Sequence, residues 1–167
     1  MQRLFSLLIF WLCFVPGISY SIPVPDVLLP VGHAKLKVLW FDIYHADLFS
    51  NNGTFTEIKG PLYLKLTYQR NIDKDDLLNE TKIQLNSLGA SEAIERWIYQ
   101  LNLLWPDIKK DDSLSFYLAP SGKGHFYHNG IYIGAMSDPS FGTNFLAIWL
   151  GEKSSFPKMT KQLIGGQ

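Results

Sequence analysis

A strict alternation of apolar and polar residues between Pro61 and Arg70 constrains the fold of this chain more than any other feature. Every second side chain is large and apolar, and the residues between them are mostly polar. A period of two is typical of a β-strand with one buried face. Directly after it the apolar period becomes three and four, which is typical of a helix. The chain must therefore pack helices against a sheet, and the strand's buried face is predicted to comprise Leu62, Leu64, Leu66 and Tyr68.

Two helices are predicted after this strand. The first begins near Asp73, a residue type that caps helices, and ends at Gly89. The second begins near Ser91 and ends before Pro106. The second helix carries an aromatic and aliphatic stripe that could line a ligand site, but this spacing is more typical of core packing. The stripe comprises Ile94, Trp97, Ile98, Leu101 and Leu104.

Further strands are predicted on both sides of this helical pair. Before it, β-branched, aromatic and alternating residues from Ala34 to Phe49 predict one long or broken strand. After it, three short strands are predicted, with Asn129-Gly130 as the turn between the last two. These strands cover residues 113–119, 125–128 and 131–136.

Two more helices are predicted to close the chain. Asp138-Pro139 has the composition of a helix start, with Asp as the cap and Pro in the first turn, and Gly151 ends the pattern. Pro157 opens a last short helix that runs through Leu163. The order of strands, helices, strands and helices predicts a single α+β domain with an antiparallel sheet.

The N-terminus is predicted to be a removable leader. A short basic start is followed by an apolar run from Leu4 to Val15, a Pro-Gly break, and small residues up to Ser21. This is the layout of a secretory signal peptide, so we expect residues 1–21 to be cleaved after Ser21 and residues 22–167 to form the domain. The protein would then be periplasmic or secreted. The alternative is a retained anchor, but the run is too short to span about 30 Å of hydrocarbon, and we expect no stable membrane span after cleavage.

Composition excludes several classes of function. The 15 basic residues balance the 15 acidic ones, which gives no electrostatic case for binding nucleic acid or an anionic membrane surface. The only cysteine, Cys13, lies in the predicted leader, so we expect neither a disulfide nor a thiolate zinc site. The four histidines lack metal-binding spacing, and there is no phosphate loop or nucleophile elbow. We therefore expect no metal and no cofactor.

Polar side chains on otherwise apolar strands are the remaining candidates for a site. A cation beside tyrosines on a sheet face could bind a phenolate or a carboxylate. The alternative is that these residues are simply the solvent-facing positions of half-exposed strands. The set comprises Lys35, Lys37, Asp42, Tyr44, Asp47, Tyr68 and Arg70.

The ordered set of motifs along the chain resembles the chalcone isomerase-like proteins, in particular their small exported bacterial branch. Four groups of residues carry the resemblance and span nearly the whole predicted domain. They are Gly32 to Phe49; Leu64 to Ile72; Asn129-Gly130, Gly134, Asp138-Pro139, Phe141 and Ile148-Trp149-Leu150-Gly151; and Leu163-Ile164-Gly165.

The resemblance implies a chalcone isomerase-like open-faced β-sandwich, in which a curved antiparallel sheet has helices packed on one face. The plant enzymes of this fold cyclise a chalcone to a flavanone, using an arginine and a threonine on the early strands and a tyrosine near the first helix. Tyr44 falls near the position of that threonine, and Lys35 or Lys37 would have to replace the arginine, although lysine lacks its planar geometry. Between Asp73 and Lys82 there is no tyrosine.

Because relatives of this fold also bind fatty acids without catalysis, the resemblance favours non-catalytic binding of a small apolar or amphipathic acid in a cleft between sheet and helices. The predicted ligand-binding residues are Lys37, Tyr44, Tyr68 and Arg70. One alternative is an isomerase, an intramolecular lyase of the chalcone isomerase type with a different substrate. The other is a structural or interaction protein of the cell envelope, whose cleft is filled by its own side chains.

Overall fold

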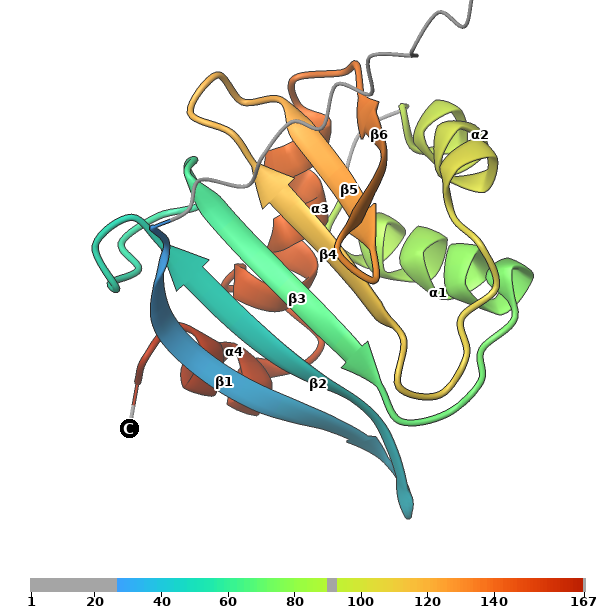
Figure 1. Ribbon diagram of the computed structural model, residues 1–167, viewed down its shortest axis with the longest axis horizontal. Helices are drawn as coiled ribbons and strands as arrows, with labels where there is room; N and C mark the ends of the chain where they lie inside the picture. The colour runs from blue at the N-terminus through green and yellow to red at the C-terminus, as the bar shows by residue number, and fades with distance from the viewer. Residues whose placement is uncertain (1–26, 90–92, 167) are drawn as a thin grey trace, which may run out of the picture.

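The computed structural model describes residues 27–89 and 93–166, which form one six-stranded antiparallel sheet with four helices. The strands follow one another across the sheet in chain order, from β1 to β6. All four helices lie on the same face of the sheet (Figure 1). This confirms the predicted α+β class and the chalcone isomerase-like arrangement. The elements are β1 (Leu29–Val38), β2 (Phe41–Ser50), β3 (Leu62–Tyr68), α1 (Lys74–Ser87), α2 (Ile94–Leu104), β4 (Ser113–Leu118), β5 (Gly124–His128), β6 (Ile131–Met136), α3 (Phe141–Leu150) and α4 (Pro157–Leu163).

The strand with the clearest alternation forms as the sequence predicts. In β3, Leu62, Leu64, Leu66 and Tyr68 are buried while the residues between them are partly exposed. The neighbouring strands place their own apolar residues in register with this set. Leu66, for example, pairs with Ala46 of β2 on one side and with Leu114 of β4 on the other. One face of the sheet thus becomes a continuous apolar floor for the helices.

The segment from Ala34 to Phe49 differs from its prediction. It is not one long or broken strand but a hairpin, in which β1 and β2 pair antiparallel and the chain reverses at Leu39 and Trp40. Leu39 has a φ of 54°, in the left-handed region that Gly or Asn usually occupies. Because both turn residues are large and apolar, neither gives the turn signal that hairpin prediction relies on.

An aromatic core fills the sheet–helix interface beneath β4 and β5. Phe116 and Phe126 lie 4.9 Å apart between ring centroids, and Phe145 of α3 lies 4.9 Å from Phe116. Such tilted and edge-on ring pairs stabilise a core beyond the area that they bury. We call this set the aromatic core: Trp97, Trp105, Phe116, Phe126, Phe141 and Phe145.

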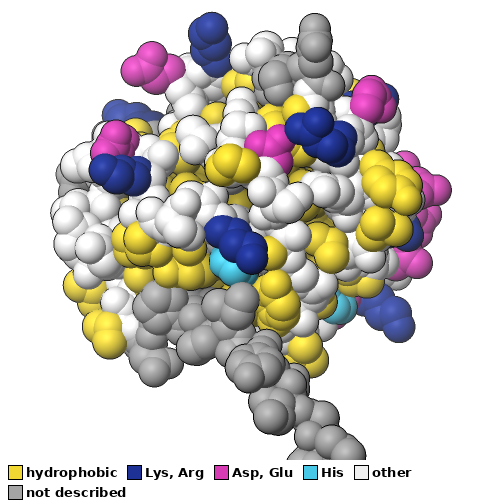
Figure 2. Space-filling model, turned by 90° about the horizontal axis from the view of Figure 1, so that it is seen from above, with side chains coloured by type: hydrophobic (Ala, Val, Ile, Leu, Met, Phe, Trp, Pro, Cys, Tyr) yellow, Lys and Arg dark blue, Asp and Glu magenta, His cyan; other side chains and the backbone are white. Residues whose placement is uncertain are grey.

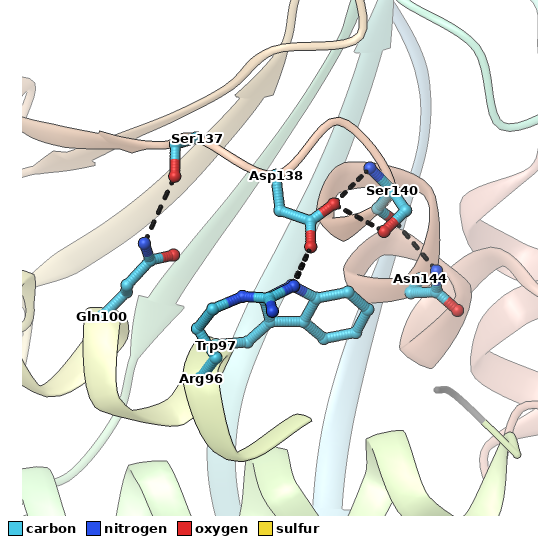
Figure 3. Close-up of polar contacts among 7 residues, drawn as sticks. All are labelled: Arg96, Trp97, Gln100, Ser137, Asp138, Ser140 and Asn144. Carbon is cyan, nitrogen blue, oxygen red and sulfur yellow. Dashed lines mark hydrogen bonds and ion pairs between the residues drawn. The ribbon is translucent and has the colours of Figure 1, made fainter. Parts of the chain in front are cut away.

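A polar clasp holds α2 to the start of α3 beside this core (Figure 3). One oxygen of the Asp138 carboxylate accepts from Arg96 Nη2 at 2.8 Å and from Trp97 Nε1 at 2.9 Å. The other oxygen accepts from the Ser140 backbone N–H at 3.0 Å and from its hydroxyl at 2.7 Å. These hydrogen bonds lower the pKa of Asp138 far below its usual value, so the clasp is ionised at neutral pH. Asp138 therefore supports the start of the helix, as expected. The helix itself begins at Phe141, with Ser140 as its N-cap residue. The hydrogen bonds from Arg96 and Trp97 of α2 to Asp138 were not predicted.

Candidate functional site

A cavity of about 610 Å³ lies between the sheet and the helices on the other side of the aromatic core. The inner faces of β1, β2 and β3 form its floor, α1 and α3 form its walls, and Trp105 and Phe145 of the aromatic core separate the two regions. Most of its lining is apolar. The lining residues are Leu36, Val38, Ile43, Tyr44, Leu66, Tyr68, Ile72, Asp76, Leu77, Asn79, Glu80, Thr81, Gln84, Trp105, Leu114, Phe145, Ile148, Trp149, Ser155 and Phe156.

Two tyrosines on neighbouring strands supply the polar groups of the cavity floor. Tyr44 of β2 and Tyr68 of β3 are register partners, and their rings meet edge to face at 5.6 Å between centroids. Trp149 of α3 donates its Nε1–H to the Tyr44 hydroxyl oxygen at 2.8 Å. This buried hydrogen bond fixes the Tyr44 ring across the cavity and ties α3 to the sheet.

Both phenols stay neutral throughout the physiological range. Burial raises the pKa of Tyr44 and of Tyr68 well above the usual value, because a buried phenolate would lose its hydration. For Tyr44 the hydrogen bond from Trp149 opposes this shift and the charge of Glu80 adds to it. Since the Tyr44 oxygen accepts from Trp149, its proton remains available to a ligand. The Tyr68 hydroxyl makes no hydrogen bond to any residue that the structure describes, so it too can donate.

The rim of the cavity on the α1 side is acidic. Asp76 and Glu80 lie one helical turn apart among the lining residues, and Gln84 donates from Nε2 to Glu80 at 2.7 Å. No lysine, arginine or histidine occurs among the lining residues within the described part of the chain. The site therefore offers neutral hydrogen-bond donors on its floor and negative charge at one edge, and its described lining contains no cationic side chain to neutralise a buried anion.

The structure brings two of the four predicted site residues into the cavity and places the other two outside its lining. Tyr44 and Tyr68 line it, as described. Lys37 lies on the outer face of β1, where its Nζ is 3.2 Å from Asp42 Oδ1. Arg70 follows β3 and stacks over the ring of Phe41, 5.7 Å from its centroid. The strand alternation that puts Lys37 on one face and its neighbours Leu36 and Val38 on the other is the sequence signal for this separation.

Three features of the site were missed by sequence reasoning. No sequence pattern indicated that Trp149 holds Tyr44 across 105 residues of chain. Asp76 and Glu80 were not predicted to be site residues, whereas both reach the cavity rim. Such contacts depend on how α1 and α3 lie over the sheet, and no local pattern encodes that.

On the face seen in Figure 2, acidic and basic side chains are interspersed rather than collected in one patch. In residues 27–89 and 93–166 there is no group of three or more His, Cys, Asp or Glu side chains placed to hold a metal ion. Of the helices in that part of the chain, none has the length and hydrophobicity needed to cross a bilayer.

Comparison with known proteins agrees with this architecture. A family described as "Chalcone isomerase-like" matches residues 32–165, which include all four helices and the sheet from Gly32 of β1 onward. The chain belongs to the chalcone isomerase-like family. An uncharacterized protein of Haemophilus influenzae is 28% identical over 137 residues, which are 81% of this chain and 67% of that protein.

The chalcone isomerase-like fold of this chain is also similar to that of a solved plant structure. The crystal structure of an Arabidopsis thaliana fatty-acid binding protein superimposes with a TM-score of 0.63. The match covers 90% of this chain and 94% of the plant chain, at 12% sequence identity. At this identity the similarity establishes the shared fold, and the ligand named for the plant protein belongs to that protein.

Proposed function

We propose that this chalcone isomerase-like protein binds, without chemical conversion, a small amphipathic ligand with an apolar, fatty-acid-like chain. The observation that carries the proposal is the cavity of about 610 Å³, whose apolar lining contains two neutral phenols. This volume lies within the range of about 300 to 1,000 Å³ typical of pockets for small molecules. The fatty-acid binding protein of similar fold supports an acyl chain as the apolar part of the ligand.

The composition of the lining favours binding over isomerisation. Cyclisation of a chalcone generates negative charge on oxygen, and a catalyst must stabilise that charge within the site. Lys35 and Lys37, the cations that the resemblance offered in place of the enzymes' arginine, both lie outside the lining, and so does Arg70. A structural protein with a filled cleft is also a poorer fit, because the cavity is open.

The polar groups of the cavity define the ligand's polar end. Tyr44 and Tyr68 can each donate one hydrogen bond, so the ligand should present an acceptor such as a carbonyl, an ester or an un-ionised carboxyl group. Asp76 and Glu80 at the rim repel a free carboxylate. A fatty acid would therefore place its carboxyl group on the floor in the protonated form, or turn it outward away from α1.

The first test is native mass spectrometry of the protein purified gently from its own host, followed by titration with a dansyl-labelled fatty acid. We expect a co-purifying lipid-like mass and saturable binding of the probe. Leu66→Trp fills the floor of the cavity and should abolish probe binding. Leu103→Trp adds the same side chain at an exposed position of α2 outside the lining and should bind like the wild type. Equal binding by both variants would show that the probe binds elsewhere and would overturn the proposal.

We also propose that the protein works outside the cytoplasm, after removal of its leader. The apolar run ending before Pro16-Gly17 supports export, and residues 1–26 lie outside the part of the chain that the structure describes. The intact mass from the same preparation checks this proposal, because cleavage after Ser21 leaves a chain that begins at Ile22.

A further inference from the structure

The hairpin of β1 and β2 projects beyond the rest of the sheet. Strand β2 pairs with β3 only from Tyr44 onward, whereas its pairing with β1 continues out to Val38 and Phe41. The outer part of the hairpin is therefore a two-stranded ribbon without a third strand beside it, and it extends past the other elements at the lower right of Figure 1. We call residues 38–41 the hairpin tip.

The hairpin tip is apolar and exposed. The exposed fractions are 49% for Val38, 84% for Leu39, 94% for Trp40 and 60% for Phe41. Four consecutive apolar side chains in water are unfavourable unless something covers them. Scattered exposed apolar residues need no explanation, but a continuous set at the end of a projecting ribbon does.

The backbone conformation at the hairpin tip would suit a small or polar residue better than the leucine that occupies it. Leu39 takes a φ of 54°, a conformation that costs a residue with a branched side chain free energy and that Gly or Asn adopts easily. The turn between β5 and β6 shows the usual solution, since Asn129 and Gly130 occupy its left-handed positions with φ of 51° and 78°. Leu39 thus keeps an apolar side chain where turn geometry favours a small or polar one.

Cations lie around the base of the hairpin tip, two of them on its outer face. Lys35 and Lys37 flank Asp42 at 3.3 Å and 3.2 Å, and Arg70 covers one face of Phe41. Three positive groups against one carboxylate leave this collar net basic, although the chain as a whole is neutral. An apolar end that carries a tryptophan, with basic residues behind it, matches the layers of a bilayer surface, where acyl chains lie beneath anionic headgroups.

The inner face of the same hairpin lines the cavity. Leu36, Val38 and Ile43 are all lining residues, so the hairpin tip continues directly into the cavity wall. A bilayer in contact with the tip would lie at the edge of the cavity. A ribbon that projects by about three residues at about 3.3 Å each reaches about 10 Å, comparable to the depth at which amphipathic elements bury in a membrane interface.

We propose that the hairpin tip inserts into the interface of a lipid bilayer, with the basic collar facing anionic headgroups, and so places the cavity mouth against the membrane. Docking as such rests on the tip and the collar alone. Its purpose, the transfer of an amphipathic ligand between bilayer and cavity, rests on the proposed function. Asp76 and Glu80 make the α1 side of the cavity acidic, so anionic headgroups repel that side. The outer face of β1 and β2 therefore turns toward the headgroups.

Co-sedimentation with phosphatidylcholine vesicles, with and without phosphatidylglycerol, tests the proposal. The protein is purified from its host and its N-terminus is read by intact mass, so that only chains with the same N-terminus are compared. We expect binding to both vesicle types, stronger with phosphatidylglycerol. We expect a loss of about a hundredfold in Leu39→Asn/Trp40→Ser, because each of the two lost apolar side chains removes about one decade of partitioning. Ile131→Ser, at the exposed side chain beside the other hairpin turn, is the matched control and should bind like the wild type.

Brominated lipids give a second readout that holds even if a retained leader contributes to vesicle binding. They should quench the emission of Trp40, and Trp40→Phe should remove the quenched component while keeping vesicle binding. Equal sedimentation of wild type and the double variant, together with unquenched Trp40, would overturn the proposal. So would a dimer in the absence of vesicles that Trp40→Ser dissociates, since the tip would then be covered by a second copy or another protein. Probe binding by the double variant at wild-type affinity separates the two proposals, because docking can fail while the cavity still binds its ligand.

Discussion

The two ends of the same sheet–helix interface are built differently. Beneath β4 and β5, the aromatic core fills the space between sheet and helices, and the clasp at Asp138 locks α2 to α3. Beneath β1, β2 and β3, the same sheet face and the same helical layer enclose a cavity. Protein interiors normally pack as densely as organic crystals, so a cavity of this size lowers stability by forgone contacts. The difference indicates that one end supplies the stability that allows the other to remain open.

The largest expected effect on unfolding free energy comes from truncating a buried leucine to alanine, once at the filled end and once at the open end. Leu118 of β4 is 2% exposed and packs against Gly142 of α3, where an added Cβ would lie 2.6 Å from Leu118 Cδ1. Leu66 of β3 is 5% exposed but faces the cavity. We expect Leu118→Ala to cost about 3 to 5 kcal/mol of unfolding free energy and Leu66→Ala about 2, because a wall beside empty space loses fewer contacts. Urea denaturation of both variants measures the difference, and equal losses would show that the two ends are packed alike.

The next effect concerns the clasp at the filled end. Asp138→Asn replaces charge-assisted hydrogen bonds from Arg96 and Trp97 with neutral ones, and we expect a loss of about 2 kcal/mol at pH 7. Because folding lowers the pKa of Asp138, its contribution is complete above the unfolded value of about 4 and declines as the pH falls below it. The difference between wild type and variant should therefore shrink in acid.

Denaturation between pH 7 and pH 2 checks this dependence. Asp112, whose pKa is lowered to about 2 chiefly by hydrogen bonds from Asn129 and the Lys109 backbone N–H, also loses its contribution in acid. It is present in both proteins, so its effect cancels in the difference. A difference in unfolding free energy that stays constant across the whole pH range would mean that the charge of Asp138 does not contribute to the clasp.

The contrast between the two ends also explains what sequence reasoning could reach. Periodicity predicted β3, α1 and the strands that follow, because each buries one regular face. Sequence reasoning chose Tyr44 and Tyr68 because they are polar side chains on otherwise apolar strands, and both line the cavity. It missed the turn at Leu39 and Trp40, where the residues contradict the usual turn chemistry, and the rim at Glu80, which depends on the position of α1. These features belong to the candidate site or to the hairpin tip, where function competes with local propensity.

The same reasoning limits what net charge can exclude. A neutral chain argued against an anionic membrane surface, yet Lys35 and Lys37 lie together on the hairpin and Arg70 stacks on its Phe41. The acidic Asp76 and Glu80 instead line the α1 side of the cavity. Attraction to a surface depends on charges within about 10 Å, roughly one Debye length. Local segregation therefore matters more than the sum over the chain.

The smallest expected effect on stability is that of Tyr68→Phe, whose comparison is Tyr44→Phe at the same open end. Tyr44→Phe removes the acceptor of the buried Trp149 N–H and should cost about 1 to 3 kcal/mol of unfolding free energy. Tyr68→Phe removes a hydroxyl that bonds to no described residue, so its unfolding free energy should change by less than about 0.5 kcal/mol.

If the cavity binds a ligand through its phenols, Tyr68→Phe should nevertheless weaken probe binding several-fold, since a donor inside an apolar site has no water to replace it. Thermal denaturation and probe titration on the same samples measure both quantities. A Tyr68→Phe protein that is as stable as the wild type and binds equally well would leave Tyr68 without a role in the ligand site. A destabilised one would mean that its hydroxyl belongs to the packing of the sheet rather than to the cavity.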